Sequence, residues 1–150
     1  MRIALGSDHG GYSAKEALKP VLASLGHEAK DFGTTSAEPV DYPVYAFKVG
    51  EEVAAGRFDR GILLCGTGIG MGIAANKVKG IRAAVCWSAE AAKLSREHND
   101  ANVLCTGARL LNARQIEELV RVWLSTAFSG DERHVRRINQ VREREERWRG

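Results

Sequence analysis

The most informative segment of the chain is Ile62-Leu-Leu-Cys-Gly-Thr-Gly-Ile-Gly-Met-Gly-Ile-Ala-Ala-Asn76. Its apolar run from Ile62 to Leu64 is typical of a short strand buried on both faces, and the run stops at Cys65. The alternate glycines that follow allow a sharp turn with exposed backbone N–H groups, and Met71 to Asn76 favours the start of a helix. The sequence therefore predicts a strand, a tight loop and a helix, with an anion site at the loop.

The glycine pattern differs from the two nucleotide-binding motifs that it superficially resembles. A dinucleotide fingerprint needs Gly-x-Gly-x-x-Gly, but its third glycine position falls on Met71 or Ile73, depending on where the count begins. A Walker-type phosphate loop needs Gly-Lys-Ser/Thr, which is absent. A tight turn without a ligand is the plain alternative. The thiol of Cys65 and the hydroxyl of Thr67, on a loop whose amides can hold an oxyanion, favour a proton-transfer site.

Composition narrows the class of protein. The chain has 150 residues, of which 44% are hydrophobic, and this is enough for one domain with a buried core. No apolar segment approaches the ~20 residues that span a bilayer. The first residues show a strand pattern and not a signal peptide, so we expect a cytoplasmic protein with no membrane partner. The net charge of +3 is small and predicts no nucleic-acid partner.

The three cysteines, Cys65, Cys86 and Cys105, are widely spaced and form no C-x-x-C pair. This spacing argues against a disulfide framework or a zinc site and predicts reduced thiols. Cys86 and Cys105 lie within apolar segments, so we expect them in the core. Trp87 and Trp123 are likewise predicted to be packing residues.

Strand and helix patterns alternate along the chain. We expect strands at Arg2–Gly6, His27–Phe32, 61–65, Ile81–Trp87 and Asn102–Thr106. Besides the helix that starts at Met71, helices are expected over 12–25 with a kink or early break at Pro20, over Val44–Ala55, from Ser88 towards Asp100, and from Asn112 through Leu124. The alternation predicts one α/β domain over residues 1–150. Its architecture would be a three-layer α/β/α sandwich with a five-stranded parallel sheet, flavodoxin-like or Rossmann-like, plus a C-terminal helix at about 131–149.

The topology predicts where a ligand binds. In such sheets, ligands lie outside the carboxyl ends of the strands, at the point where the strand order reverses. If the order is 2-1-3-4-5, this point lies between the first and third strands, whose exit loops carry Asp8, His9 and the Cys65 loop. Arg109 follows the fifth strand and falls on the same edge. His98 precedes the fifth strand, so the rule does not place it there.

Seven short motifs are spread over nearly the whole chain: Gly6-Ser-Asp-His-Gly-Gly11, Asp41-Tyr-Pro43, Cys65-Gly-Thr-Gly-Ile-Gly70, Ala74-Ala-Asn-Lys77, Gly80-Ile-Arg-Ala83, Ser95-Arg-Glu-His-Asn-Asp100 and Gly107-Ala-Arg109. With these motifs together, the chain resembles the type B ribose-5-phosphate isomerases. They belong to the sugar-phosphate isomerase family that also includes allose-6-phosphate and galactose-6-phosphate isomerases. The resemblance implies interconversion of an aldose phosphate and its ketose through an enediolate, typically ribose 5-phosphate and ribulose 5-phosphate, without a metal or other cofactor.

The resemblance also implies roles for particular residues of the loop. Cys65 would be the base that moves the proton, and Thr67 would lie beside it. An ordinary thiol is a poor base at neutral pH, so the loop amides would have to stabilise its thiolate. The same amides would hold the enediolate oxygens; they belong to Gly66, Thr67, Gly68, Ile69 and Gly70.

Other residues are implied to open the sugar ring or to bind the substrate. His98 resembles the ring-opening group, but His134 lies in a segment from which some relatives supply that histidine, so both stay candidates. The residues expected to hold sugar hydroxyls are Asp8, His9, Tyr42 and Asn99. Those expected to clamp the phosphate are Arg109, Arg133 and Arg137, of which the last two are four residues apart and share a helix face.

Family sites form between two subunits, so the resemblance implies a homodimer or a tetramer, with the C-terminal helix packed on the partner. The predicted function is a ribose-5-phosphate isomerase of pentose phosphate and carbohydrate metabolism. One alternative is the same chemistry on allose 6-phosphate, galactose 6-phosphate or a tetrose phosphate, because nothing in the loops measures chain length. The other is a binding module for sugar phosphates that has no catalytic activity.

Overall fold

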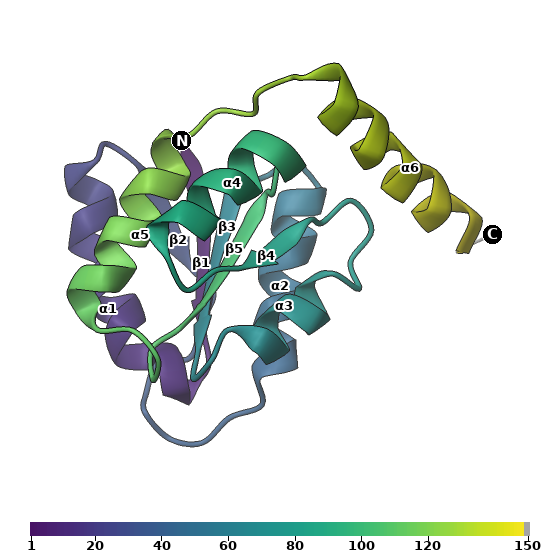
Figure 1. Cartoon of the computed structure of the whole chain (residues 1–150). Helices are drawn as coiled ribbons and strands as arrows, with labels where there is room; N and C mark the ends of the chain where they lie inside the picture. Colours follow the sequence, from purple (N-terminus) through teal and green to yellow (C-terminus); the bar gives the residue numbers. More distant parts are fainter. Residues whose placement is uncertain (149–150) are drawn as a thin grey trace.

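Five parallel strands form one sheet in the computed structural model, which describes residues 1–148 (Figure 1). The strands are β1 (Arg2–Ser7), β2 (Glu28–Asp31), β3 (Arg60–Cys65), β4 (Ala83–Val85) and β5 (Val103–Gly107). Their order is β2-β1-β3-β5-β4, so the expected order 2-1-3-4-5 is wrong in its last two places. The five residues of β5 are all buried, which suits the inner position, whereas β4 has no fully buried residue and lies at the edge.

Helices cover both faces of this sheet. On one face lie α1 (Tyr12–Ser24), α4 (Ala89–Asn99) and α5 (Ala113–Ser125), and on the other lie α2 (Tyr42–Ala54) and α3 (Ile69–Ala75). Ile62 and Leu64 belong to the first core, and Leu63 between them belongs to the second. Successive side chains of a strand point to opposite faces, so one apolar run fills both cores. The predicted α/β/α sandwich is confirmed.

Several element boundaries differ from the sequence prediction, and three of the differences are informative. α2 begins at Tyr42 and not at Val44, because a proline at position 43 is tolerated in the first turn, where its missing N–H has no helical partner. α1 continues past Pro20 to Ser24, so the alternative of an early break is wrong. β4 covers only Ala83–Val85, the part of the expected strand that pairs with β5.

The core confirms several predictions about single residues. Trp123, Cys86 and Cys105 are buried, and the three cysteines are free thiols. Burial raises the pKa of both Cys86 and Cys105, because a thiolate is poorly solvated among apolar side chains. No helix within residues 1–148 is long and apolar enough to cross a membrane.

The last helix, α6 (Glu132–Trp148), lies beyond the β4 edge of the sheet (Figure 1). It confirms the expected C-terminal helix up to residue 148, and residue 149 lies outside the described part. Of its apolar face, Ile138 is buried while Val141 is 61% exposed. Near its end, the Glu145 carboxylate accepts the N–H of Gly80 at 3.0 and 3.1 Å. The helix therefore contacts the main body with only part of its apolar face.

Candidate active site

The loops that follow β1, β3 and β5 meet at the carboxyl edge of the sheet. The register pairs Ser7 with Leu64, and Cys65 with Gly107, so the three strands end at the same level. The N–H of Arg109 donates to the carbonyl of Gly66 at 3.0 Å. Because β5, and not β4, neighbours β3, the loop after β5 lies directly against the loop that carries the thiol.

Cys65 ends β3 with a side chain that is largely buried, since the residue is 6% exposed. The backbone N–H of Gly68 donates to its Sγ at 3.0 Å. Gly68 has φ +85°, a left-handed conformation that only glycine adopts readily, and this turn brings its amide to the sulfur. The loop therefore holds this thiol at the carboxyl edge of the sheet, with a backbone hydrogen bond to its sulfur.

Thr67 lies at the tip of the same loop. Its Oγ1 accepts the N–H of Ile69 at 3.2 Å, so two of the amides expected to hold an enediolate, those of Gly68 and Ile69, are bonded within the loop. Trp87 Nε1 donates to the Thr67 carbonyl at 2.7 Å. Trp87 is 47% exposed, so the prediction that it is a packing residue is wrong. Its place just after a strand, at the carboxyl edge, was the signal that could have found it.

Tyr42 and Arg109 lie against the two ends of this loop. A Cβ atom on Gly70 would come within 2.7 Å of Cζ of Tyr42. A Cβ atom on Gly66 would lie 3.0 Å from Nη1 of Arg109. The absence of a side chain at Gly70 allows the close approach of the Tyr42 ring, and Gly66 leaves room for the Arg109 guanidinium. The loop is bordered by a phenol on one side and a guanidinium on the other, which suits a polyhydroxylated anion.

Asp8 and His9 follow β1 at the same edge. The Asp8 carboxylate is 7% exposed and accepts the N–H of Gly11 at 3.2 Å, which caps the short 3-10 turn η1 (His9–Gly11). The N–H of Val40 donates to Nδ1 of His9 at 3.2 Å. With Nδ1 as an acceptor, the neutral His9 ring carries its proton on Nε2 and can donate it to a ligand. His9 also ties the loop before α2 to this edge.

The other predicted residues lie at the opposite edge of the sheet. α4 runs back from the carboxyl edge and ends at Asn99, shortly before β5 begins. At ~3.3 Å per residue, the length of β5 separates His98 from Cys65 by roughly 16 Å. We call the set at this opposite edge the α4–α6 group, and its members are His98, Asn99, Arg133, His134 and Arg137. One chain does not bring this group to the thiol.

Two histidines form the centre of the α4–α6 group. The rings of His98 and His134 are stacked, with centroids 4.3 Å apart and an interplanar angle of 14°. His134 is buried, and its Nε2 has no hydrogen-bond partner among the described residues, with Asp131 Oδ2 4.0 Å away. Burial lowers the pKa of His134, and the neighbouring His98 and Arg133 lower it further. The His134 ring is therefore neutral at pH 7.

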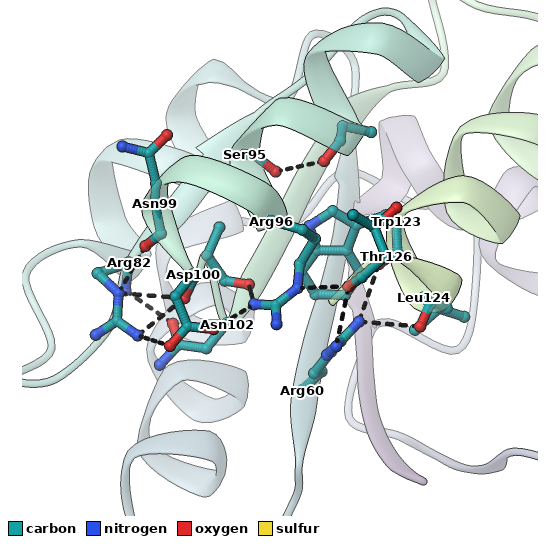
Figure 2. Close-up of polar contacts among 12 residues, drawn as sticks. Arg60, Arg82, Ser95, Arg96, Asn99, Asp100, Asn102, Trp123, Leu124 and Thr126 are labelled. Carbon is teal, nitrogen blue, oxygen red and sulfur yellow. Dashed lines mark hydrogen bonds and ion pairs between the residues drawn. The ribbon is translucent and has the colours of Figure 1, made fainter. Parts of the chain in front are cut away.

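The end of α4 is held by ion pairs, which Figure 2 shows. Asp100 has φ 46° and is the single non-glycine residue with positive φ in the described part of the chain. Its carboxylate pairs with Arg82 at 3.1 Å and with Arg96 at 2.9 Å. Arg82 also donates to the Asn99 carbonyl at 3.0 Å. Both arginines stand in motifs quoted above, but sequence reasoning assigned them no role.

Asn99 and Arg137 border a groove of about 310 Å³ between α6 and the main body, which Arg82 and Ile138 also line. Arg133 is exposed and has Asp131 3.9 Å away. Within residues 1–148, no three His, Cys, Asp or Glu side chains are grouped so that they could hold a metal ion. The groove thus offers amide and guanidinium donors, as a phosphate site requires.

An open parallel α/β sheet with polar side chains at a strand-order reversal defines a protein that binds small molecules at its carboxyl edge. A family model described as Ribose/Galactose Isomerase matches residues 3–141, and the chain belongs to this family. The family resemblance inferred from the motifs is thereby confirmed.

Individual relatives agree with this assignment. The protein named ribose-5-phosphate isomerase B of Escherichia coli is 44% identical over 146 residues, which cover 97% of each chain. The solved ribose-5-phosphate isomerase B of Clostridium thermocellum superposes with a TM-score of 0.96 at 48% identity and 99% coverage of both chains. The Mycoplasma genitalium enzyme, solved with bound ribulose-5-phosphate, has a TM-score of 0.92 at 37% identity and covers 97% of this chain and 96% of its own.

Proposed function

We propose that the chain is an aldose-ketose isomerase that interconverts D-ribose 5-phosphate and D-ribulose 5-phosphate through an enediolate. The names of its relatives and the ribulose-5-phosphate bound to one of them support this substrate. The single observation that carries the chemistry is the Cys65 thiol, held at the carboxyl edge by the Gly68 N–H at 3.0 Å. The thiol is placed where the ligand of an α/β sheet binds, and in the proposed reaction it acts as the base in its thiolate form.

The reaction then needs one base and one hydroxyl from this loop. The carbonyl at C1 of the open-chain aldose makes the C2 proton acidic, and the Cys65 thiolate removes it to leave an enediolate. The resulting thiol returns the proton to C1. The C2 hydroxyl gives up its proton as C2 becomes the ketone, and the C1 oxygen takes up a proton as it becomes a hydroxyl, so no proton is gained or lost overall. Thr67 Oγ1 accepts the Ile69 N–H, so its own hydroxyl proton is available to an enediolate oxygen during the transfer.

We further propose that two copies of the chain share each site. The edge with Cys65, Tyr42 and Arg109 would come from one copy. The partner would supply the α4–α6 group, which opens the ring and binds the phosphate. The roughly 16 Å between these groups supports this proposal, because it exceeds the length of one sugar phosphate. A homodimer would hold two such sites, and a tetramer would be a pair of dimers.

An apolar surface supports this association. β4 is an edge strand, and Val85 on it is 37% exposed. Ile69 and Ile73 on the neighbouring α3 are 44% and 58% exposed. A second copy that covered this surface would bury apolar side chains and an open strand edge together. The free thiols support a cytoplasmic location, where cysteines stay reduced.

The test is NMR of ribose 5-phosphate in D2O with the wild-type chain and with Cys65→Ala. The wild type should form the ketose and incorporate deuterium at the carbon next to the carbonyl. Cys65→Ala should lower both rates by roughly 10²–10⁴, the usual contribution of a general base. Cys86→Ala is the matched control, because Cys86 is buried on the other side of the sheet from the loop's core and takes no part in the chemistry.

Two outcomes would contradict the proposal. A wild-type chain that neither isomerises ribose 5-phosphate nor exchanges deuterium is not this isomerase, and allose, galactose and erythrose phosphates would then identify its substrate. Full activity of Cys65→Ala would remove Cys65 as the base while leaving the reaction in place.

A further inference from the structure

We propose that His134 is a positioning residue for His98: its buried ring holds the His98 imidazole by stacking, and His98 is the ring that faces the sugar. This inference rests on the proposed isomerase function and deepens it. It assigns different tasks to the two histidines that the sequence leaves as alternatives for ring opening.

His98 is more accessible to a sugar than His134. A ring-opening group exchanges a proton with the oxygen atoms of the furanose, so it must touch the sugar. His98 is partly exposed and lies beside the exposed Asn99, which borders the groove under α6. His134 is only 5% exposed, and its Nε2 reaches no partner among the described residues. His134 could therefore meet a substrate only if the ring stacked on it moved away.

The charges around His134 disfavour a protonated ring. The His98 ring, which belongs to α4, faces the His134 ring. Asp131, Arg133 and Arg137, from the same C-terminal segment as His134, also act on it. Burial, His98 and the two arginines lower the pKa of His134, and the 4.0 Å to Asp131 is too long for a hydrogen bond to offset them. Two charged rings 4.3 Å apart would also repel each other. Of the two rings, His134 is thus the one less suited to carry the proton that ring opening needs.

Ion pairs restrain the backbone next to His98, and the stacked ring restrains its side chain. Asp100, paired with Arg82 and Arg96, fixes the backbone at the end of α4. The His98 side chain still has rotations about its own bonds, and a parallel ring at an interplanar angle of 14° restrains them. Precise orientation of an acid-base group matters because a misplacement of ~1 Å can cost roughly 10²-fold in rate.

A reaction of an open-chain sugar separates a role in opening the furanose ring from a role in the proton transfer by Cys65. Ribulose 5-phosphate cannot close a furanose ring, because its C5 oxygen carries the phosphate. Exchange of its C1 hydrogen with D2O therefore needs Cys65 but no ring opening. Turnover of cyclic ribose 5-phosphate needs both Cys65 and ring opening. The ratio of these two rates reports the ring-opening step alone.

The experiment compares His134→Ala, which removes the stacked ring, with His134→Phe, which keeps a ring but cannot hold a proton. We expect His134→Ala to lower kcat for ribose 5-phosphate by roughly 10- to 100-fold, while exchange into ribulose 5-phosphate changes by less than about threefold. His134→Phe should restore most of the lost turnover. His98→Phe should lose turnover of ribose 5-phosphate and keep the exchange.

The following results would overturn the inference. If His134→Phe is as impaired as His134→Ala, the His134 ring itself transfers a proton. If KM rises equally for both sugars, His134 contacts the substrate and does not act through His98. If both variants turn over ribose 5-phosphate normally, the stack has no role in ring opening. A wild-type chain that exchanges no deuterium into ribulose 5-phosphate would instead contradict the proposed function itself.

Discussion

At the scale of single residues, the three cysteines show how the surroundings decide what one side chain can do. Cys65 has a backbone N–H at its sulfur and lies at the end of a strand beside an open loop. Cys86 and Cys105 are buried in the core, where burial raises the pKa of their thiols. A thiol with a raised pKa is rarely a thiolate at neutral pH and reacts slowly.

Iodoacetamide should therefore alkylate Cys65 faster than the two core thiols and inactivate the enzyme. Ribose 5-phosphate should protect Cys65, because the substrate covers the loop. Mass spectrometry of peptides after partial inactivation measures both effects. Loss of activity with the label only on Cys86 or Cys105 would contradict the assignment.

Arg137 should contribute to binding of the phosphate and less to the chemistry. Arg137→Ala should raise KM by roughly 10- to 100-fold, because a charge-assisted hydrogen bond is worth ~1.5–3 kcal/mol, with a smaller change in kcat. Arg136→Ala is the matched control, since Arg136 lies on the outer face of α6, away from the groove. An unchanged KM in Arg137→Ala would exclude Arg137 from the site.

Glu52 should make stability depend on pH in the acid range. Hydrogen bonds from Arg57 and then Lys48 lower the pKa of Glu52 to about 2. A carboxyl whose folded pKa is depressed stabilises the fold above its unfolded value of ~4.3 and loses this contribution as the pH falls towards the folded value. Urea unfolding of the wild type and Glu52→Gln should differ at pH 7 and converge between pH 4 and 2. A difference that stays constant over this range would contradict the assignment.

At the scale of elements, the end of α4 depends on residues from a different part of the chain. Asp100 needs a left-handed backbone, and Arg82 from the segment before β4 pairs with it. This arrangement places Asn99 at the groove, with His98 next to it in the chain. The turn at Asp100 therefore does more than end α4, because it orients two residues of the proposed site.

Two substitutions at Asp100 should separate the contribution of its backbone conformation to stability from that of its ion pairs. Asp100→Gly removes both ion pairs but adopts the left-handed conformation freely. Asp100→Ala removes the same pairs and adds the left-handed cost of ~1–2 kcal/mol. Urea unfolding should therefore show Asp100→Ala to be the less stable variant by about that amount. Equal stability of the two variants would mean that φ at this position carries no strain.

Much of this organisation was predictable because it follows from local patterns. Apolar runs predicted the strands, and the helix expected from Asn112 is α5, which Asn112 caps. The swapped positions of β4 and β5 in the sheet were not predictable, because strand order depends on which strand is buried most completely. The Asp100 ion pairs and the stack of His98 on His134 join distant segments, so local patterns carry no signal for them.

At the scale of the whole molecule, the predicted site residues fall into two groups on opposite edges of one sheet. The loop residues around Cys65 come together as the topology rule predicts. The α4–α6 group does not join them within one chain, and its assignment came from the family resemblance. The proposed shared site accounts for both groups, and it makes association a condition of activity.

Mixed dimers test this central proposal most directly. Cys65→Ala and His98→Phe chains, each inactive on ribose 5-phosphate by itself, would be coexpressed with different tags, and the mixed dimer would be purified. In a two-fold dimer, one site then combines both substitutions and the other has neither, so activity should recover to about half that of the wild-type dimer. If each chain holds its own complete site, both sites of the mixed dimer carry one substitution, and activity no higher than that of the parent variants would contradict the account.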